Sequence, residues 1–181
     1  EQTDVHRGEV LTHPAEFRPS SIIDVKLKAL ARSPLTLRNR RKVDLHHFTS
    51  EVEARIVFPE IEALEPGQET MAQLRTATPI VPSTGDRFVI RAFSPSITLG
   101  GGVILNPRGV KLRARSAKTF VELDKEDEVG IVAALVRSGG LPGVTKNELL
   151  GLSGLPAKRL DKALDTLRNA HTVIRFDRAE D

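Results

Sequence analysis

Apolar and polar side chains alternate with a period of two over much of the first 105 residues, as they do in half-buried β-strands. Turn-forming pairs such as Pro66-Gly67 separate the alternating segments. The run 79–82 begins and ends with proline, so we expect an extended edge or a connection there. Short strands at this spacing predict an antiparallel barrel or a sandwich. The expected strands are residues 5–12, 22–30, 42–48, 51–59, 71–78, 86–93 and 97–105.

After a basic, turn-rich stretch at residues 106–117, the period of the pattern becomes helical. Apolar residues three and four apart form one stripe between residues 129 and 136. We expect Asp124 to cap the start of this helix, and Gly139-Gly140 to end it.

Two further helices and a strand are expected after that. Thr145 and Glu148 have the spacing of a capping box, and a third helix opens at Pro156. Residues 172–176 are rich in β-branched side chains and predict a strand. This order is typical of a winged helix. The fold class is therefore β plus α, with an antiparallel β-barrel followed by a winged-helix domain.

The composition excludes several classes of chemistry. The chain has 39% hydrophobic and 28% charged residues and no cysteine, which fits a globular protein without disulfides or thiolate zinc sites. It contains neither a phosphate-binding P-loop motif nor a nucleophile elbow. His46 and His47 are neighbours in an expected strand, so they point to opposite faces and cannot chelate one metal ion. We therefore expect no catalytic residue, metal site or cofactor in this chain.

The apolar runs, the start of the chain and its net charge lead to further expectations. No apolar run is long enough to span a bilayer, and no signal-peptide pattern is present. The chain begins at Glu1 within a strand-like pattern, which suggests an excised fragment. The net charge of +3 is carried by residues 1–117, because the rest of the chain is slightly acidic. Such a basic excess permits a polyanionic partner.

Two features of the predicted barrel could contact a nucleic acid. The triple glycine at residues 100–102 either bends the barrel or lets a nucleic-acid backbone come close, and residue chemistry alone favours the bend. A basic run before an expected strand is either a solvated loop or a set of phosphate contacts. Further arginines lie on strand faces opposite the presumed core. The basic run comprises Arg38, Arg40, Arg41 and Lys42, and the strand arginines are Arg55, Arg75, Arg87 and Arg91.

Several strings carry a resemblance to a known family. Gly-Asp-Arg-Phe-Val-Ile-Arg at residues 85–91 is followed by Thr-Leu-Gly-Gly-Gly-Val-Ile-Leu-Asn-Pro at 98–107, and His-His-Phe-Thr-Ser-Glu begins at residue 46. These strings resemble the third domain of the selenocysteine-specific elongation factors, which are translational GTPases. Residues 7–11 resemble the end of the second domain of that family.

The resemblance implies a domain organisation. Residues 1–17 would be the tail of a preceding β-barrel, and residues 18–109 a barrel like the third domain of elongation factor Tu. Residues 110–117 would be a linker. Residues 118–181 would be the first of the family's C-terminal winged-helix modules.

The resemblance also implies a tRNA-facing role for the triple glycine, because in elongation factor Tu this strand and the first hairpin approach the T-stem of the bound tRNA. Phe48 stands where the family often has Gly, and Ile97 stands where elongation factor Tu has Arg. The tRNA-binding candidates are Thr49, Ser50, Glu51, Arg55, Arg91, Thr98, Gly100 and Gly101. The basic run 38–42 supplies the other phosphate-contact candidates.

The parent protein implied by the resemblance is cytoplasmic. It binds GTP with Mg²⁺, carries selenocysteinyl-tRNA to the ribosome and recognises an mRNA hairpin through its last winged-helix modules. This chain would be a monomeric, non-enzymatic piece that helps to bind the tRNA and spaces the GTPase from those modules. Two alternatives stay open: a DNA-binding regulator that reads bases with helix 156–170, and a structural adaptor without nucleic-acid affinity.

Overall fold

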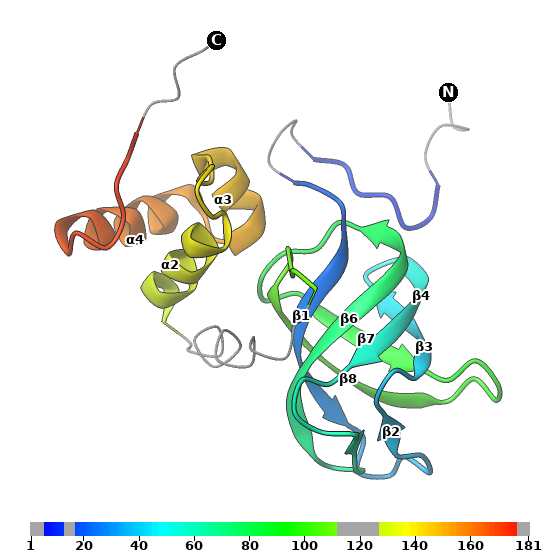
Figure 1. Ribbon diagram of the computed structural model, residues 1–181. Helices are drawn as coiled ribbons and strands as arrows, with labels where there is room; N and C mark the ends of the chain where they lie inside the picture. Colours follow the sequence, from blue (N-terminus) through cyan, green and yellow to red (C-terminus); the bar gives the residue numbers. More distant parts are fainter. Residues whose placement is uncertain (1–5, 13–16, 112–126, 177–181) are drawn as a thin grey trace.

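The computed structural model describes residues 6–12, 17–111 and 127–176, and their elements are labelled in Figure 1. In chain order these elements are β1 (Ser20–Ala29), β2 (Leu37–Arg38), β3 (Lys42–His47), β4 (Ser50–Val57), β5 (Ala63–Leu64), β6 (Glu69–Ile80), β7 (Arg87–Arg91), β8 (Thr98–Asn106), α2 (Glu128–Ser138), α3 (Lys146–Ser153) and α4 (Ala157–Asn169).

Six strands form a closed antiparallel barrel in the order β1-β6-β4-β3-β7-β8, and β2 pairs with β5 in a small separate sheet. Closure leaves the barrel without a free edge that another strand could extend. Side chains alternate as the sequence pattern predicts: Val43 and Leu45 of β3 are fully buried, whereas Asp44 between them is partly exposed. The predicted barrel is therefore confirmed, and its interior is the larger of the two apolar cores.

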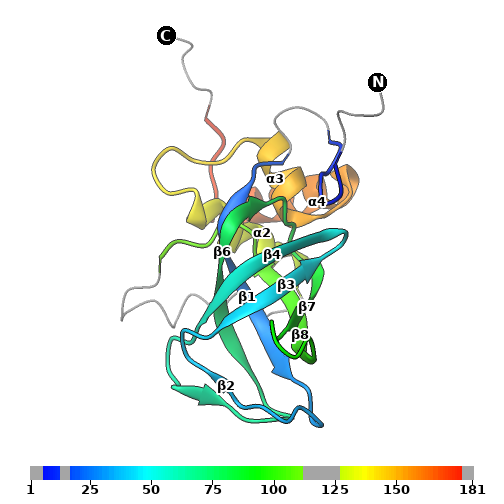
Figure 2. The same cartoon turned by 90° about the vertical axis from the view of Figure 1, so that its right-hand side faces the viewer.

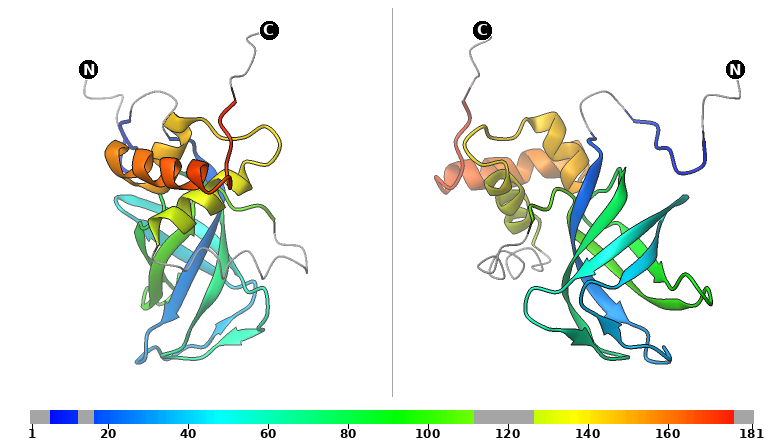
Figure 3. Two further views of the ribbon diagram at one scale, coloured as in Figure 1. Left: turned by 90° about the vertical axis from the view of Figure 1, so that its left-hand side faces the viewer. Right: turned by 45° about the vertical axis from the view of Figure 1, so that its right-hand side comes forward.

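Residues 127–176, called the helical unit below, pack α2, α3 and α4 around the second core. Leu135 of α2 and Leu160 of α4 are almost completely buried in it. The capping box predicted at Thr145 is present at the start of α3, with reciprocal bonds to Glu148. The helical unit lies at one end of the barrel and β2 at the other, as Figures 2 and 3 show from further sides.

Two expected strands are wrong. Residues 6–12 form no strand, because the closed barrel offers them no free edge, and Leu11 is 88% exposed. Residues 172–176 form no strand either, because no strand in the described part of the chain pairs with them. The helices have the order of a winged helix, but the described residues 127–176 contain no wing. The winged-helix assignment therefore stays a prediction.

Three smaller expectations also change. The N-cap of α2 is Asp127, whose side chain accepts a hydrogen bond from the first turn, and Asp124 lies outside the described residues. Ile80 is not part of a connection but belongs to β6, where it pairs with Ser20 of β1 and is 4% exposed. Most of the predicted linker, residues 112–117, lies outside the described residues.

A buried carboxylate marks the place where the chain leaves the barrel. Asp24, on the outer face of β1, accepts hydrogen bonds from Gln73 Nε2 at 2.8 Å and Asn106 Nδ2 at 2.9 Å. Burial raises the pKa of Asp24, and these two hydrogen bonds offset that effect only in part. Gly109 packs so closely that a Cβ on it would lie 2.9 Å from Asp24 Oδ1. This polar cluster therefore fixes the path of the chain after β8.

Candidate nucleic-acid interface

The tRNA-binding candidates lie on two different sides of the barrel. Arg55 is on β4, whereas Thr98, Gly100 and Gly101 are on β8, and Arg91 is on the adjacent β7. In the ring of six strands, β4 and β8 are three positions apart and thus opposite each other. A single tRNA helix lying on one side of the barrel cannot therefore contact both Arg55 and the glycine strand.

A row of cations crosses β3, β4 and β6. Lys42 of β3 is the direct partner of Arg55 on β4, and Arg55 is the direct partner of Arg75 on β6. All three point outward, because their chain neighbours Val43, Ala54 and Leu74 are buried. Lys42, Arg55 and Arg75 are called the basic row below. Strand pattern alone placed Arg75 on an outer face, but only the cross-strand register shows that it faces Arg55.

The basic run before β3 extends this row. Arg40 N donates to Ile56 O at 2.8 Å, and Ile56 N donates to Arg41 O at 3.0 Å. These bonds continue the ladder of β4 immediately beyond Arg55, so Arg40 and Arg41 border the basic row. Arg38 lies further away, on β2, where it pairs with Ala63.

The basic row is only partly neutralised by the protein itself. Lys42 Nζ forms an ion pair with Glu53 Oε1 at 2.7 Å, and Arg75 Nε donates to Gln73 Oε1 at 2.9 Å. Arg55 is exposed and makes no ion pair with any residue in the described part of the chain. Like charges directly opposite each other on neighbouring strands are destabilising. The facing pair Arg55 and Arg75 thus creates a place where an anion would relieve repulsion.

The triple glycine is explained by the barrel itself. A Cβ on Gly101 would lie 2.5 Å from Phe88 O of β7, and a Cβ on Gly100 or Gly102 would overlap main-chain carbonyls of β1. Neighbouring strands approach β8 too closely for any side chain. This close packing accounts for the three glycines within the barrel, whereas the predicted bend and the tRNA-facing role stay predictions.

The side of the barrel around the glycine strand also carries cations: Lys28 of β1 faces Gly101, and Lys26 of β1 and Arg87 of β7 both face Val103. Arg91 directly faces Asp44 of β3 and Thr98 of β8. Its Nη2 donates to Ser96 O at 3.1 Å in the following turn. Its positive charge is thus opposed by a neighbouring carboxylate, and one nitrogen is engaged by the protein. Thr98 is exposed and available for contact.

The remaining candidates lie at the tip of the β3–β4 hairpin, where His47 pairs with Ser50. Phe48 has a φ of 50°, in the left-handed region that favours glycine, which accounts for the glycine expected at this position. Arg7 Nε donates to Thr49 O at 3.2 Å, and Glu51 faces His46 across the hairpin. The departure from glycine at residue 48 therefore leaves the turn intact, and exposes an aromatic ring.

The described residues can also be compared with what a metal site or a membrane-spanning helix would require. No group of three or more His, Asp or Glu side chains in that part of the chain is arranged to hold a metal ion. No helix of the described residues is long and apolar enough to cross a membrane. Of the two neighbouring histidines, His47 is 2% exposed and bonded to Asp86, whereas His46 is partly exposed, as the alternation of a strand predicts.

Comparison with known proteins gives consistent results for the barrel and for the whole chain. Residues 22–111 match the family model of the β-barrel domain of selenocysteine-specific elongation factors. A selenocysteine-specific elongation factor from Desulfomicrobium baculatum is 36% identical over 180 residues. That alignment covers 98% of this chain and 28% of the relative. The chain therefore spans little more than a quarter of the length of that protein.

Proposed function

The chain belongs to the selenocysteine-specific elongation factor family, and we propose that its barrel binds the phosphate backbone of selenocysteinyl-tRNA through the basic row. One observation carries this proposal: Arg55 and Arg75 face each other on adjacent strands, and Lys42 continues the row. The domain matched is the family's β-barrel domain. GTP and Mg²⁺ would accordingly be bound elsewhere in the parent protein.

The spacing of the basic row suits a nucleic-acid backbone. Neighbouring strands lie about 4.8 Å apart, so the three cations extend over roughly 10 Å. Phosphates bound by arginine and lysine release counterions, which is the main source of sequence-independent affinity. A phosphate between Arg55 and Arg75 would also remove the repulsion between their guanidinium groups. Arg40 and Arg41 would lengthen the contact along the same strand of RNA.

The other predicted contact residues and the helical unit have smaller or different roles in this proposal. The hairpin tip at residues 49–51 and the glycine side around Thr98 would contact RNA only if it wraps beyond the basic row. The helical unit would space the barrel from C-terminal modules that bind the mRNA hairpin. In the cytoplasm, the parent factor would deliver its tRNA to the ribosome. The comparisons give no support to a DNA-binding regulator, and the mixed charges of α4 do not favour one.

The test is a titration of the chain against labelled selenocysteine tRNA at several salt concentrations, comparing Arg55→Ala with Arg91→Ala and Arg87→Ala. Loss of one phosphate contact should reduce the slope of log affinity against log salt by about 0.7–0.9. We expect that reduction for Arg55→Ala. Arg87→Ala is the matched control, because Arg87 is an exposed arginine whose direct partner is Val103 of β8.

The other outcomes would reject the proposal in different ways. A reduced slope for Arg91→Ala or Arg87→Ala, with Arg55→Ala unchanged, would show that the tRNA lies on the glycine side. Equal slopes for all variants would show that the barrel makes no phosphate contact at these residues. No binding at moderate salt by the unaltered chain would support the structural adaptor.

A further inference from the structure

Helix α3 of the helical unit contacts the barrel through residues in its first and its last turn. Its first turn presents Glu148, and its last turn presents the carbonyl groups of Gly151 and Leu152. Glu148 is 8% exposed, which is unusual for a glutamate. A buried carboxylate is costly unless it is paired and hydrogen-bonded. Its partners therefore show what the burial achieves.

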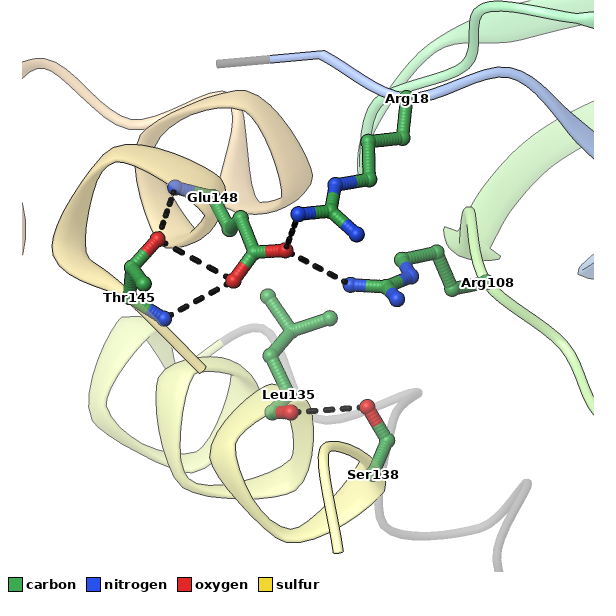
Figure 4. Close-up of polar contacts among 6 residues, drawn as sticks. All are labelled: Arg18, Arg108, Leu135, Ser138, Thr145 and Glu148. Carbon is green, nitrogen blue, oxygen red and sulfur yellow. Dashed lines mark hydrogen bonds and ion pairs between the residues drawn. The ribbon is translucent and has the colours of Figure 1, made fainter. Parts of the chain in front are cut away.

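The two oxygens of Glu148 have different partners (Figure 4). Oε2 accepts hydrogen bonds from the backbone N of Thr145 at 3.0 Å and from its Oγ1 at 3.1 Å, which completes the capping box. Oε1 faces away from the helix and binds Arg18 Nη2 at 2.8 Å, with Arg108 Nη1 at 3.6 Å. One oxygen thus stabilises the start of α3, and the other reaches the barrel.

The two arginines come from the two ends of the barrel chain. Arg18 lies just before β1, and Arg108 lies just after β8. Burial is the largest single effect on the pKa of Glu148 and opposes ionisation, but the hydrogen bonds from Thr145 and the charges of Arg18 and Arg108 together outweigh it. The pKa of Glu148 is therefore lowered, and the carboxylate is charged at neutral pH.

The far end of α3 is held by a different part of the barrel. The last carbonyl groups of a helix have no partner within the helix. Here Ser83 Oγ donates to Gly151 O at 2.7 Å, and Thr84 N donates to Leu152 O at 2.9 Å. The connection between β6 and β7 therefore caps the C-terminal end of α3.

That connection is itself firmly attached to the barrel. Asp86 Oδ2 accepts from Ser83 N at 2.7 Å and lies 3.0 Å from His47 Nε2 at the end of β3. Gly85 N donates to Ile104 O of β8 at 2.8 Å. The groups that cap α3 thus cannot shift without breaking bonds to β3 and β8.

We propose that Glu148 is the latch of a rigid joint, which holds the helical unit in one orientation on the barrel. One contact would leave α3 free to swing, whereas two contacts on this eight-residue helix, from residues up to four positions or about 6 Å apart along its axis, prevent rotation about either. The barrel and the helical unit then turn as one body. This inference is independent of tRNA binding, and it makes the unit a spacer of fixed direction rather than a flexible tether.

The absence of cysteine allows a direct test, because two introduced cysteines can be spin-labelled without competing sites. Glu60→Cys on the barrel and Lys158→Cys on α4 replace exposed residues away from the joint. Double electron–electron resonance then measures the distribution of label-to-label distances. We expect one narrow distribution for the labelled parent chain.

Glu148→Gln removes the ion pairs with the barrel but keeps the helix cap. Glutamine also serves at this position of a capping box, but it carries no charge for Arg18 and Arg108. We expect the narrow distribution to be lost in Glu148→Gln, and equally in the double variant Arg18→Gln with Arg108→Gln. The matched control is Arg159→Gln, which removes an ion pair with Glu128 inside the helical unit and should leave the distribution unchanged.

The double arginine variant decides the matter if Glu148→Gln destabilises α3, because it leaves the capping box intact. Circular dichroism verifies that its helix content equals that of the parent chain. An unchanged narrow distribution in this variant would overturn the role of Glu148 as the latch. A broad distribution in the parent chain would overturn the rigid joint itself.

Discussion

Gly101→Ala should destabilise the barrel strongly, although it adds only one methyl group. The new Cβ would lie 2.5 Å from Phe88 O, whereas real Cβ contacts are almost never closer than 3.0 Å. Phe88 O belongs to the backbone of β7, so it cannot rotate away as a flexible side chain would. Strand β7 must move by at least half an ångström or so, and overpacking of this kind costs about 1–3 kcal/mol.

Urea denaturation at neutral pH measures this cost directly. Thermal melting is a second measurement. For a domain of 60–100 residues, 1 kcal/mol corresponds to roughly 4–8 °C in Tm, so the Tm of Gly101→Ala should be lower than that of the parent by roughly 5–20 °C. Gly130→Ala in α2 is the contrasting variant, since its Cβ would have no neighbour closer than 3.9 Å. Alanine in a helix is favoured over glycine by about 0.5–1 kcal/mol, so this variant should be more stable than the parent.

A melting temperature for Gly101→Ala within about 2 °C of the parent would refute the reasoning, because the clash is then relieved at almost no cost. The expected result has a practical consequence. Bulky replacements in the glycine strand would lower tRNA affinity through misfolding, so they cannot show whether RNA approaches that strand. Charge-removing variants of exposed arginines avoid this confusion.

Two further predictions concern the hairpin tip and the joint. Phe48→Gly should raise the free energy of unfolding by up to about 1 kcal/mol, because φ is 50° at this position and glycine adopts it without strain. A loss of stability in urea would show instead that the contact between the rings of Phe48 and His47 stabilises the hairpin. The folded-state pKa of Glu148 is below its ordinary value of 4.5, so its contribution to stability is present above pH 4.5 and is lost as the pH falls through the lower folded-state pKa. The stability difference between the parent and Glu148→Gln should therefore be constant near neutral pH and shrink below pH 4.5; a difference that persists in strong acid would contradict the assigned ion pairs.

Local sequence patterns predicted the barrel strands well, because each strand buries every second side chain. The same reasoning failed for residues 6–12, where Val10 and Leu11 have the right pattern but the closed barrel has no edge to receive them. Residues 172–176 failed for a related reason, since a strand needs a partner as well as β-branched side chains. Pairing is a property of the whole fold and cannot be read from one segment.

The candidate interface shows the same limit. Sequence alternation placed Arg55 and Arg91 correctly on outer faces, but it could not show that they lie on different sides of the barrel. That separation depends on the strand order, and the order follows from the hydrogen-bonded neighbours of β4 and β7. The buried Glu148 was predicted only as a capping residue, because its two arginine partners are 130 and 40 positions away in the chain.

The positions of the basic row and of the joint make a last prediction possible. Strand β3 begins at Lys42 and ends at His47, which lies beside the connection that caps α3. Lys42 and His47 are five residues apart, or about 17 Å along the strand. This distance exceeds the roughly 8 Å over which exposed charges act at physiological salt. Phosphates at the Lys42 end of the basic row should therefore not disturb the connection that caps α3, although Arg75 at the other end faces Ile22 of β1, four residues after Arg18.

The two proposals can accordingly be tested for independence. Arg55→Ala should weaken tRNA binding without changing the distance distribution between the barrel and the helical unit. Glu148→Gln should broaden that distribution without changing the affinity for tRNA. If Glu148→Gln also lowers the affinity, the helical unit must contribute contacts of its own, and the tRNA-binding surface must extend from the barrel across the joint.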